Sequence, residues 1–133
     1  KTQYITIDKK KVTPKKYDMD RIWSEIKRSK KALALYTPQK FLILKMQKPV
    51  NSTISDDFGK RRFFNKKPKN PHSGVDMKGK IGTPILSPLA GTVVEMGEFF
   101  FNGNVIFIDH GLGLVTMYCH TSEFSVKIGQ EVQ

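Results

Sequence analysis

The chain has 133 residues, enough for one modest domain with one main core and at most a small attached element. Hydrophobic residues make up 38% of it and charged residues 26%, with 9 Phe and 4 Tyr, so we expect a folded protein and not a disordered tail. The single cysteine, Cys119, excludes an internal disulfide and the zinc modules that need several thiolates. No apolar run approaches the roughly 18 to 20 residues of a membrane-spanning helix.

The net charge of +11 is unevenly distributed. Residues 1–71 hold 20 basic and 6 acidic residues, a net +14, whereas residues 72–133 hold 3 and 6, a net −3. A positive field of this kind attracts polyanions, and nucleic acid, anionic lipid and anionic cell-wall polymer are all candidates. The same charge is also compatible with a basic face that is simply solvated. Aromatic residues are not interleaved with the basic ones as a stacking platform requires, so we do not expect a nucleic-acid partner.

Residues 1–47 are predicted to form a small, basic α+β segment. Residues 4–7 alternate bulky and polar side chains and predict a short strand, and the lysine run 9–11 with Pro14 predicts a solvated loop. From Asp18 or Asp20 as the cap, apolar residues at helical spacing predict one amphipathic helix that ends before Pro38. The apolar positions are Met19, Ile22, Trp23, Ile26, Ala32, Leu33 and Leu35.

Residues 48–133 are predicted to form a second, mainly β unit. The apolar run 41–46 and the connector 49–52 separate the two parts, so we place the boundary near residue 47. Short β-branched and aromatic runs then follow, separated by Gly and Pro, at residues 85–86, 92–94, 104–108, 114–118 and 124–126. This spacing predicts a compact antiparallel sheet without βαβ units, and residues 109–113 fit a hairpin connection between two of its strands.

His72 and Asp76 are the first candidates for chemistry. An imidazole and a carboxylate are both good zinc ligands. On an ideal strand, residues four apart share a face but lie about 13 Å apart, so a shared metal ion requires the backbone to curl between them. Gly74 permits that curl, while Pro71 and the Ser73-Gly74 pair argue against a helix. Taken alone, the pair is a weak signal, because in most proteins such a pair is a surface pair or a turn hydrogen bond.

A second candidate lies at the end of a predicted strand, in Tyr118-Cys119-His120. Period-two alternation would place Tyr118 and His120 on one face, toward a cleft, and Cys119 on the other. A histidine beside a tyrosine can act as a general acid or base, although a half-buried structural histidine fits the same pattern. We assign no catalytic role to Cys119, or to His110, which is expected to hold the hairpin.

Together these residues resemble the lysostaphin-like, or LytM-like, zinc endopeptidases, whose members carry a His-x-Gly-x-Asp context like residues 72–76. Further matches to the family's motifs follow in the same order over residues 48–133, and together these motifs are specific to the family. They are Phe58-Gly59 with Arg61-Arg62, Gly82-Thr83-Pro84-Ile85, Ala90-Gly91-Thr92-Val93, Gly103-Asn104, Tyr118-Cys119-His120 and Val126-Lys127-Ile128-Gly129.

The resemblance implies an open, barrel-like peptidase domain with one zinc ion. Carried over residue by residue, it makes His72 and Asp76 zinc ligands and His120 the active-site histidine that assists the attack by water. The family takes its third protein ligand and a second histidine from a downstream His-x-His motif, which does not occur before Gln133. We therefore expect a truncated, inactive portion of an enzyme, with the remaining ligand beyond Gln133. The opening on Lys1, without Met or an apolar signal, is expected to be a trimmed boundary that leaves an upstream signal or anchor possible.

The implied function is hydrolysis of peptide cross-links in bacterial peptidoglycan, as a D,D-endopeptidase in the cell envelope, periplasmic or secreted. Peptidoglycan peptides are then the expected partner. The first alternative is a non-catalytic activator or scaffold of other cell-wall hydrolases. A biotinyl- or lipoyl-type carrier domain is a second, but the chain lacks the lysine between methionines that such carriers present.

Overall fold

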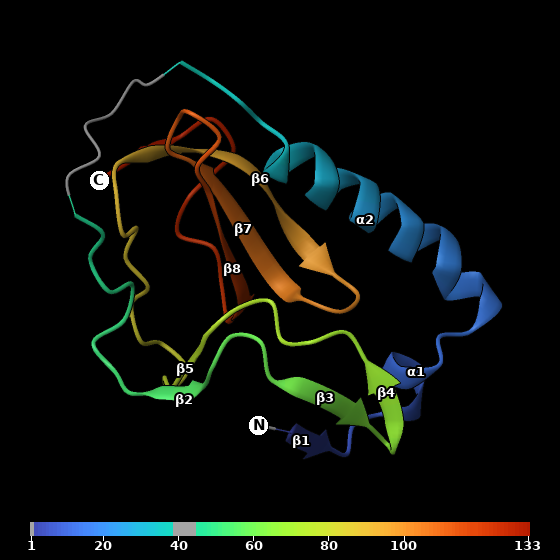
Figure 1. Ribbon diagram of the computed structural model, residues 1–133. Coiled ribbons are helices and arrows are strands. Elements are labelled where there is room, and N and C mark those ends of the chain that lie inside the picture. The colour runs from blue at the N-terminus through green and yellow to red at the C-terminus, as the bar shows by residue number, and fades with distance from the viewer. Residues whose placement is uncertain (1, 39–44) are drawn as a thin grey trace.

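The computed structural model describes residues 2–38 and 45–133 and shows a mainly β protein with a helix along one side (Figure 1). Its elements, in chain order, are β1 (Thr2–Ile5), α1 (Lys9–Val12), the 3-10 helix η1 (Lys16–Asp18), α2 (Met19–Leu33), β2 (Ile54–Asp56), β3 (Arg61–Phe64), β4 (Lys67–Lys69), β5 (Asp76–Met77), β6 (Gly91–Phe99), β7 (Gly103–Asp109), β8 (Val115–Thr121) and β9 (Glu131–Val132). The predicted fold class, an antiparallel β domain with a small α+β segment before it, is confirmed.

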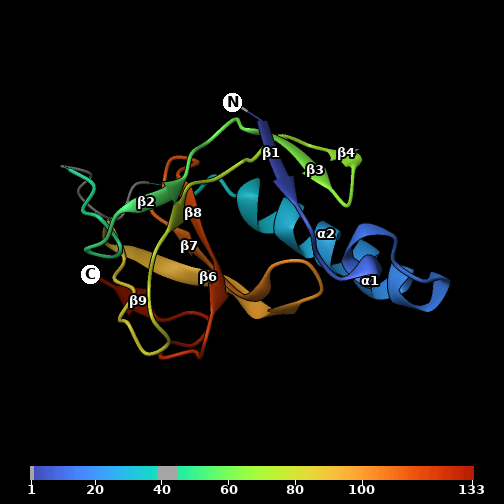
Figure 2. The same ribbon diagram turned by 90° about the horizontal axis from the view of Figure 1, so that it is seen from below.

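The main sheet has the strand order β8-β7-β6-β9, and all of its neighbouring strands are antiparallel. Figure 2 shows β9 beside β6 at the edge of this sheet. Bulges interrupt the β6–β7 and β7–β8 pairings, which strengthens the local twist and curls the sheet into a half-barrel. Two smaller sheets, β1-β3-β4 and β2-β5, lie below it in Figure 1, and they carry the His72 region.

The core lies between α2 and the main sheet. Ala32 of α2 meets three fully buried side chains of β6 and β7, Phe99, Val105 and Phe107. Asp18 occupies the N-cap position, but its side chain forms no capping hydrogen bond. The last helical residue is Leu33, so the helix ends before Pro38 as expected. Its buried positions are Ile22, Glu25 and Ala32, a spacing that keeps them on one face.

Two predictions about α2 need correction. Trp23 and Leu33, both assigned to the apolar face, are 62% and 49% exposed, whereas Glu25 is buried instead. Glu25 can be buried because each of its carboxylate oxygens accepts a hydrogen bond. Arg21 Nε donates to one oxygen at 2.7 Å, and the Phe100 backbone N–H donates to the other at 2.7 Å. A buried charge with such partners is tolerated, and here it ties α2 to the turn after β6.

Several local predictions also differ from the structure. The lysine run 9–11 is helical, because the Asp8 side chain accepts the Lys10 N–H and caps α1. The predicted strand at residues 4–7 lies at β1, two residues earlier. The runs 85–86 and 124–126 form no strand, and residues 41–44 lie outside the described part of the chain.

The boundary near residue 47 stays a prediction. Across it, β1 pairs in parallel with β3, and α2 packs on β6 and β7. Within residues 2–38 and 45–133, none of the helices has the length and apolar character needed to cross a lipid bilayer.

Candidate metal centre

The motif around His72 folds as an irregular segment that brings its two candidate ligands together. Asp76 begins β5, while residues 71–75 before it are not strand. His72 Nε2 and Asp76 Oδ1 lie 3.2 Å apart, so the curl expected from the sequence is present. Gly74 does not have a positive φ. It is instead a close neighbour of the imidazole, because a Cβ built on it would lie 3.7 Å from His72 Nε2.

The backbone holds His72 firmly in a buried position, with 8% of the residue exposed. Its N–H donates to the Lys60 carbonyl at 2.9 Å, and its own carbonyl accepts the Gly59 N–H at 2.7 Å. The ring nitrogen Nδ1 lies 3.0 Å from the Asp57 carbonyl oxygen, which can only accept a hydrogen bond. Nδ1 therefore carries the hydrogen in this contact, and Nε2 presents its lone pair toward Asp76.

These two donor atoms fit a divalent metal ion. Two ligands that each lie about 2 Å from a tetrahedral ion are about 3.3 Å apart, close to the distance between His72 Nε2 and Asp76 Oδ1. Two lone pairs this close are stabilised by a cation between them. Asp76 is about half exposed, with 51% of its side chain accessible, so an ion could reach the pair from solvent. Imidazole nitrogen and carboxylate oxygen are a donor set that zinc accepts.

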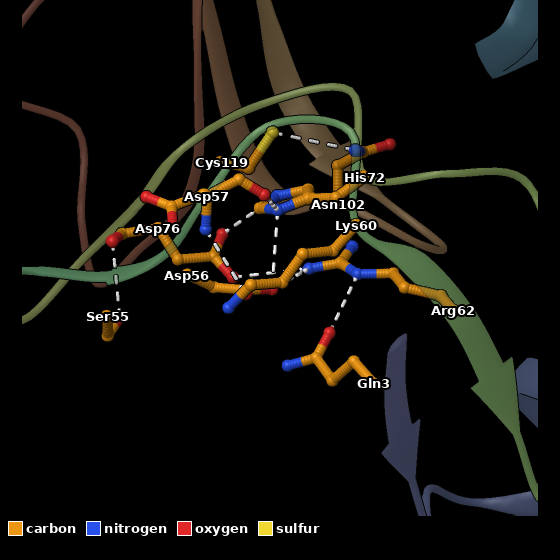
Figure 3. A network of polar contacts seen from close by, with 10 residues as sticks. All are labelled: Gln3, Ser55, Asp56, Asp57, Lys60, Arg62, His72, Asp76, Asn102 and Cys119. Carbon is orange, nitrogen blue, oxygen red and sulfur yellow. Dashed lines mark hydrogen bonds and ion pairs between the residues drawn. The ribbon is translucent and has the colours of Figure 1, made fainter. Parts of the chain in front are cut away.

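Asp56 is a member of the site that the sequence analysis missed. Asp56, His72 and Asp76 each offer one ligand atom, and these atoms lie within 4.8 Å of one another. Asp56 is only 4% exposed, and its carboxylate pairs with Lys60 and with Arg62 Nη2, the latter at 3.1 Å (Figure 3). The hydrogen bond from Lys60, followed by that from Arg62, lowers the pKa of Asp56 to about 2.

We therefore regard Asp56 as a residue that supports His72 and Asp76, and not as a third metal ligand. Both of its oxygens are engaged by cations, and its contact with His72 is to Nδ1, at 3.4 Å, on the side of the ring away from Asp76. A signal for it did exist in the sequence. Asp56 and Asp57 are the only acidic residues between positions 48 and 71, within an otherwise basic stretch.

His120 lies at an irregularity of β8. The register with β7 shifts between Asn104 and Ile106, and His120 takes a positive φ of 59°. The expected alternation is therefore broken: Tyr118 and Thr121 line one groove, while His120 is not among the residues that line it. His120 is exposed, its N–H donates to the Asn102 carbonyl at 2.9 Å, and it is not a member of the group around His72. Its catalytic role stays a prediction.

Cys119 packs inward, as expected, against the core between α2 and the sheet. Burial raises the pKa of its thiol, opposed by a hydrogen bond from Asn102, and the negative charge of Asp76 raises it further. A thiol with a raised pKa holds little thiolate at neutral pH, so the environment does not suit a nucleophile.

His110 is a structural residue, as its place in the hairpin predicted. Its side chain is fully buried, with Nδ1 2.8 Å from the Ala90 carbonyl oxygen and Nε2 2.8 Å from Thr116 Oγ1. Thr116 Oγ1 is in turn 2.8 Å from the Tyr118 hydroxyl, and burial raises the pKa of that tyrosine. Both ring nitrogens of His110 are thus satisfied, and neither is available to a ligand.

A groove of about 550 Å³ runs along the face of the sheet that carries Tyr118. Its walls come from residues 82–87, from Ile106 and Ile108 of β7, and from residues 121–123, 125–126 and 130–133. Polar and apolar side chains both line it, which suits an extended peptide better than a purely apolar ligand.

Comparison with known proteins agrees with this site. A curated metalloprotease of Buchnera aphidicola, described as uncharacterized, is 40% identical over 81 residues, 60% of this chain and 22% of its own length. The peptidoglycan DD-endopeptidase ShyA of Vibrio cholerae is 39% identical over 87 residues, 63% of this chain and 20% of its own length. The chain thus spans about a fifth of these relatives.

A crystal structure from Pseudomonas aeruginosa, whose description places it with peptidase M23, superposes with a TM-score of 0.77 at 38% identity, over 88% of this chain and 46% of that one. The model of peptidase family M23 matches residues 70–133, which include His72, Asp76 and His120. Residues 70–133 therefore match peptidase family M23, the family that the description of the similar crystal structure also gives.

Proposed function

We propose that this protein is a zinc-dependent endopeptidase that hydrolyses peptide cross-links of bacterial peptidoglycan, most specifically as a D,D-endopeptidase. The observation that carries the proposal is the 3.2 Å approach of His72 Nε2 to Asp76 Oδ1, within a segment that matches the peptidase family. The relative from Vibrio cholerae supports the substrate, because it is a peptidoglycan DD-endopeptidase. Cross-linked wall peptides lie in the envelope, so a periplasmic or secreted location is part of the same proposal.

Each residue has a distinct part in this reaction. His72 Nε2 and Asp76 Oδ1 hold the metal, and the Asp57 carbonyl keeps the imidazole in the tautomer that can bind it. A zinc ion held there would supply Lewis-acid chemistry for amide hydrolysis. His120 would move or hold a proton during hydrolysis, since an imidazole can act as a general acid or base.

A third protein ligand is also part of the proposal. Structural and catalytic zinc sites use at least three protein ligands, and Asp56 is already engaged by Lys60 and Arg62. We propose that a further protein ligand completes the site beside His72 and Asp76.

The test is cleavage of purified D,D-cross-linked muropeptide dimers by the whole protein, with products separated by chromatography. We expect the dimer to be converted to monomers in the presence of zinc, and His72→Ala to abolish this conversion. Ser73→Ala is the matched control, because it alters the same motif without removing a donor atom. Zinc binding without any cleavage would instead favour the activator of other hydrolases, and stimulation of such a hydrolase would then be measured.

A further inference from the structure

The N-terminal strand lies directly beside the strand that supports the candidate ligands. β1 pairs in parallel with β3, and in this register Gln3 is the partner of Arg62. Directly paired residues project to the same face of a sheet. Their side chains meet there: Arg62 Nε donates to Gln3 Oε1 at 3.1 Å (Figure 3).

The other end of the same guanidinium reaches the candidate metal centre. Arg62 Nη2 lies 3.1 Å from Asp56 Oδ2 and 3.3 Å from Asp76 Oδ2. Asp76 thus has one oxygen, Oδ2, turned toward Arg62 and the other, Oδ1, turned toward His72 Nε2. This division leaves Oδ1 free for a metal ion and favours a single metal–oxygen bond from Asp76.

Three side chains hold the guanidinium: Asp56 and Asp76 at Nη2, and Gln3 at Nε. The side chain of Arg62 is 19% exposed, while that of Asp76 is 51% exposed and would turn more freely without a fixed partner. A guanidinium is planar, so a hydrogen bond at Nε fixes the direction in which Nη2 points. The acceptor at Nε is Gln3, a residue of β1 that lies 59 positions away in the sequence.

We propose that Gln3 is a positioning residue for the metal centre: by fixing the plane of Arg62 it orients the Asp76 carboxylate, so that β1 is a functional part of the site. The inference rests on the proposed function, because it assumes that Asp76 binds a metal ion. Gln3 itself touches neither metal nor substrate and acts through Arg62.

Gln3 is also the place where geometry can be tested without changing charge. Removing Arg62 would delete a positive charge near the ion, and the electrostatic gain would oppose the loss of orientation. Gln3→Leu keeps the charge and most of the side-chain volume but removes the acceptor. Residues that support metal ligands typically change affinity by about 10- to 100-fold, and Gln3 is one step further away, so we expect a loss of about 3- to 10-fold.

The experiment measures the affinity of the whole protein for Zn²⁺ by competition with a chromophoric chelator, and the visible spectrum of the Co²⁺ form. Gln3→Leu should weaken Zn²⁺ binding and alter the Co²⁺ spectrum, while the melting temperature of the metal-free protein changes by no more than about 2 °C. Gln3→Glu retains an acceptor for Arg62 and should bind Zn²⁺ at least as tightly as the parent, because it also adds a negative charge near the ion. Thr2→Ala is the matched control, because Thr2 is exposed on β1 and pairs with Arg61 instead.

Unchanged Zn²⁺ affinity in Gln3→Leu would overturn the inference, and so would an equal loss in Thr2→Ala, which would indicate a general effect of the strand. The proposed function fails differently. Zn²⁺ binding without peptide cleavage would remove the proposed activity and leave the role of Gln3 standing, whereas a parent protein that binds no Zn²⁺ would overturn both.

Discussion

Replacing His110 with alanine should destabilise the fold strongly and leave metal binding intact in the molecules that fold. The ring is fully buried, and its two nitrogens lie 2.8 Å from the Ala90 carbonyl oxygen and 2.8 Å from Thr116 Oγ1. The substitution removes two hydrogen bonds, strands a buried carbonyl and opens a cavity in the hairpin between β7 and β8.

The magnitude follows from these losses. Each hydrogen bond contributes about 1 kcal/mol to stability, and the stranded carbonyl with the cavity adds about 2 kcal/mol more, so His110→Ala should cost about 4 kcal/mol. At about 3 °C per kcal/mol for a domain of this size, the melting temperature should fall by about 12 °C. Thr116→Val keeps the volume nearly constant but removes the hydroxyl that contacts both His110 Nε2 and the Tyr118 hydroxyl. It should cost about 2 kcal/mol, which provides a graded variant if His110→Ala does not fold.

The assay is thermal and urea-induced unfolding, followed by Zn²⁺ affinity measured on the folded variant. His72→Ala is the comparison, because it should lose Zn²⁺ affinity with a much smaller effect on stability. A melting temperature of His110→Ala within about 2 °C of the parent would refute the structural role, as would a folded variant that no longer binds Zn²⁺.

Two further predictions concern packing and pH. Gly91→Ala should lower the free energy of unfolding by about 2 to 3 kcal/mol. The added Cβ would lie 2.6 Å from Ile108 Cγ2 and 2.8 Å from the Asp109 carbonyl oxygen. Unchanged stability would show that β6 can move away from these atoms. A hydrogen bond from Arg28 lowers the pKa of Glu95, so this pair stabilises the fold above the ordinary carboxyl value of 4.5, and its contribution is lost as the pH falls through the lowered pKa. With Arg28 partly exposed, the pair is worth about 1 kcal/mol, and Glu95→Gln should lower the melting temperature at pH 7 and progressively less as the pH is lowered. An equal decrease at every pH would argue against the ion pair.

The sequence predicted the features that depend on local pattern. The spacing of apolar residues gave the amphipathic helix α2, and the residues 109–113 gave the hairpin between β7 and β8. The His72 and Asp76 pair was identified by residue type and confirmed as neighbours by the structure. In each case the signal lies within a short stretch of sequence. There the periodicity of apolar side chains and the preferences of turn residues determine the local structure directly.

Features that depend on distant partners were not predicted. Asp56 enters the site only because β2 pairs with β5 and because Lys60 and Arg62 surround its carboxylate. The helical pattern assigned Trp23 to the buried face of α2, but Glu25 is buried there instead. Its hydrogen-bond partner, the Phe100 N–H, lies 75 residues away in the sequence, so the pattern could not reveal it. Such partners are set by tertiary pairing, on which single-chain periodicity carries no information.

The orientation of His120 was also not predicted, because it depends on how β8 pairs with β7. Alternation along β8 predicted that Tyr118 and His120 share a face, but the bulge opposite β7 and the positive φ of His120 change its direction. A strand pattern assumes an unbroken register, and bulges near functional residues are a common exception.

The most direct test of the metal centre is a crystal structure with zinc, with anomalous diffraction measured on both sides of the zinc absorption edge. We predict one peak about 2 Å from both His72 Nε2 and Asp76 Oδ1, with Asp56 still paired to Lys60 and Arg62. The absence of a peak at this pair, or a zinc ion bound by the Asp56 carboxylate in place of Asp76, would contradict the account.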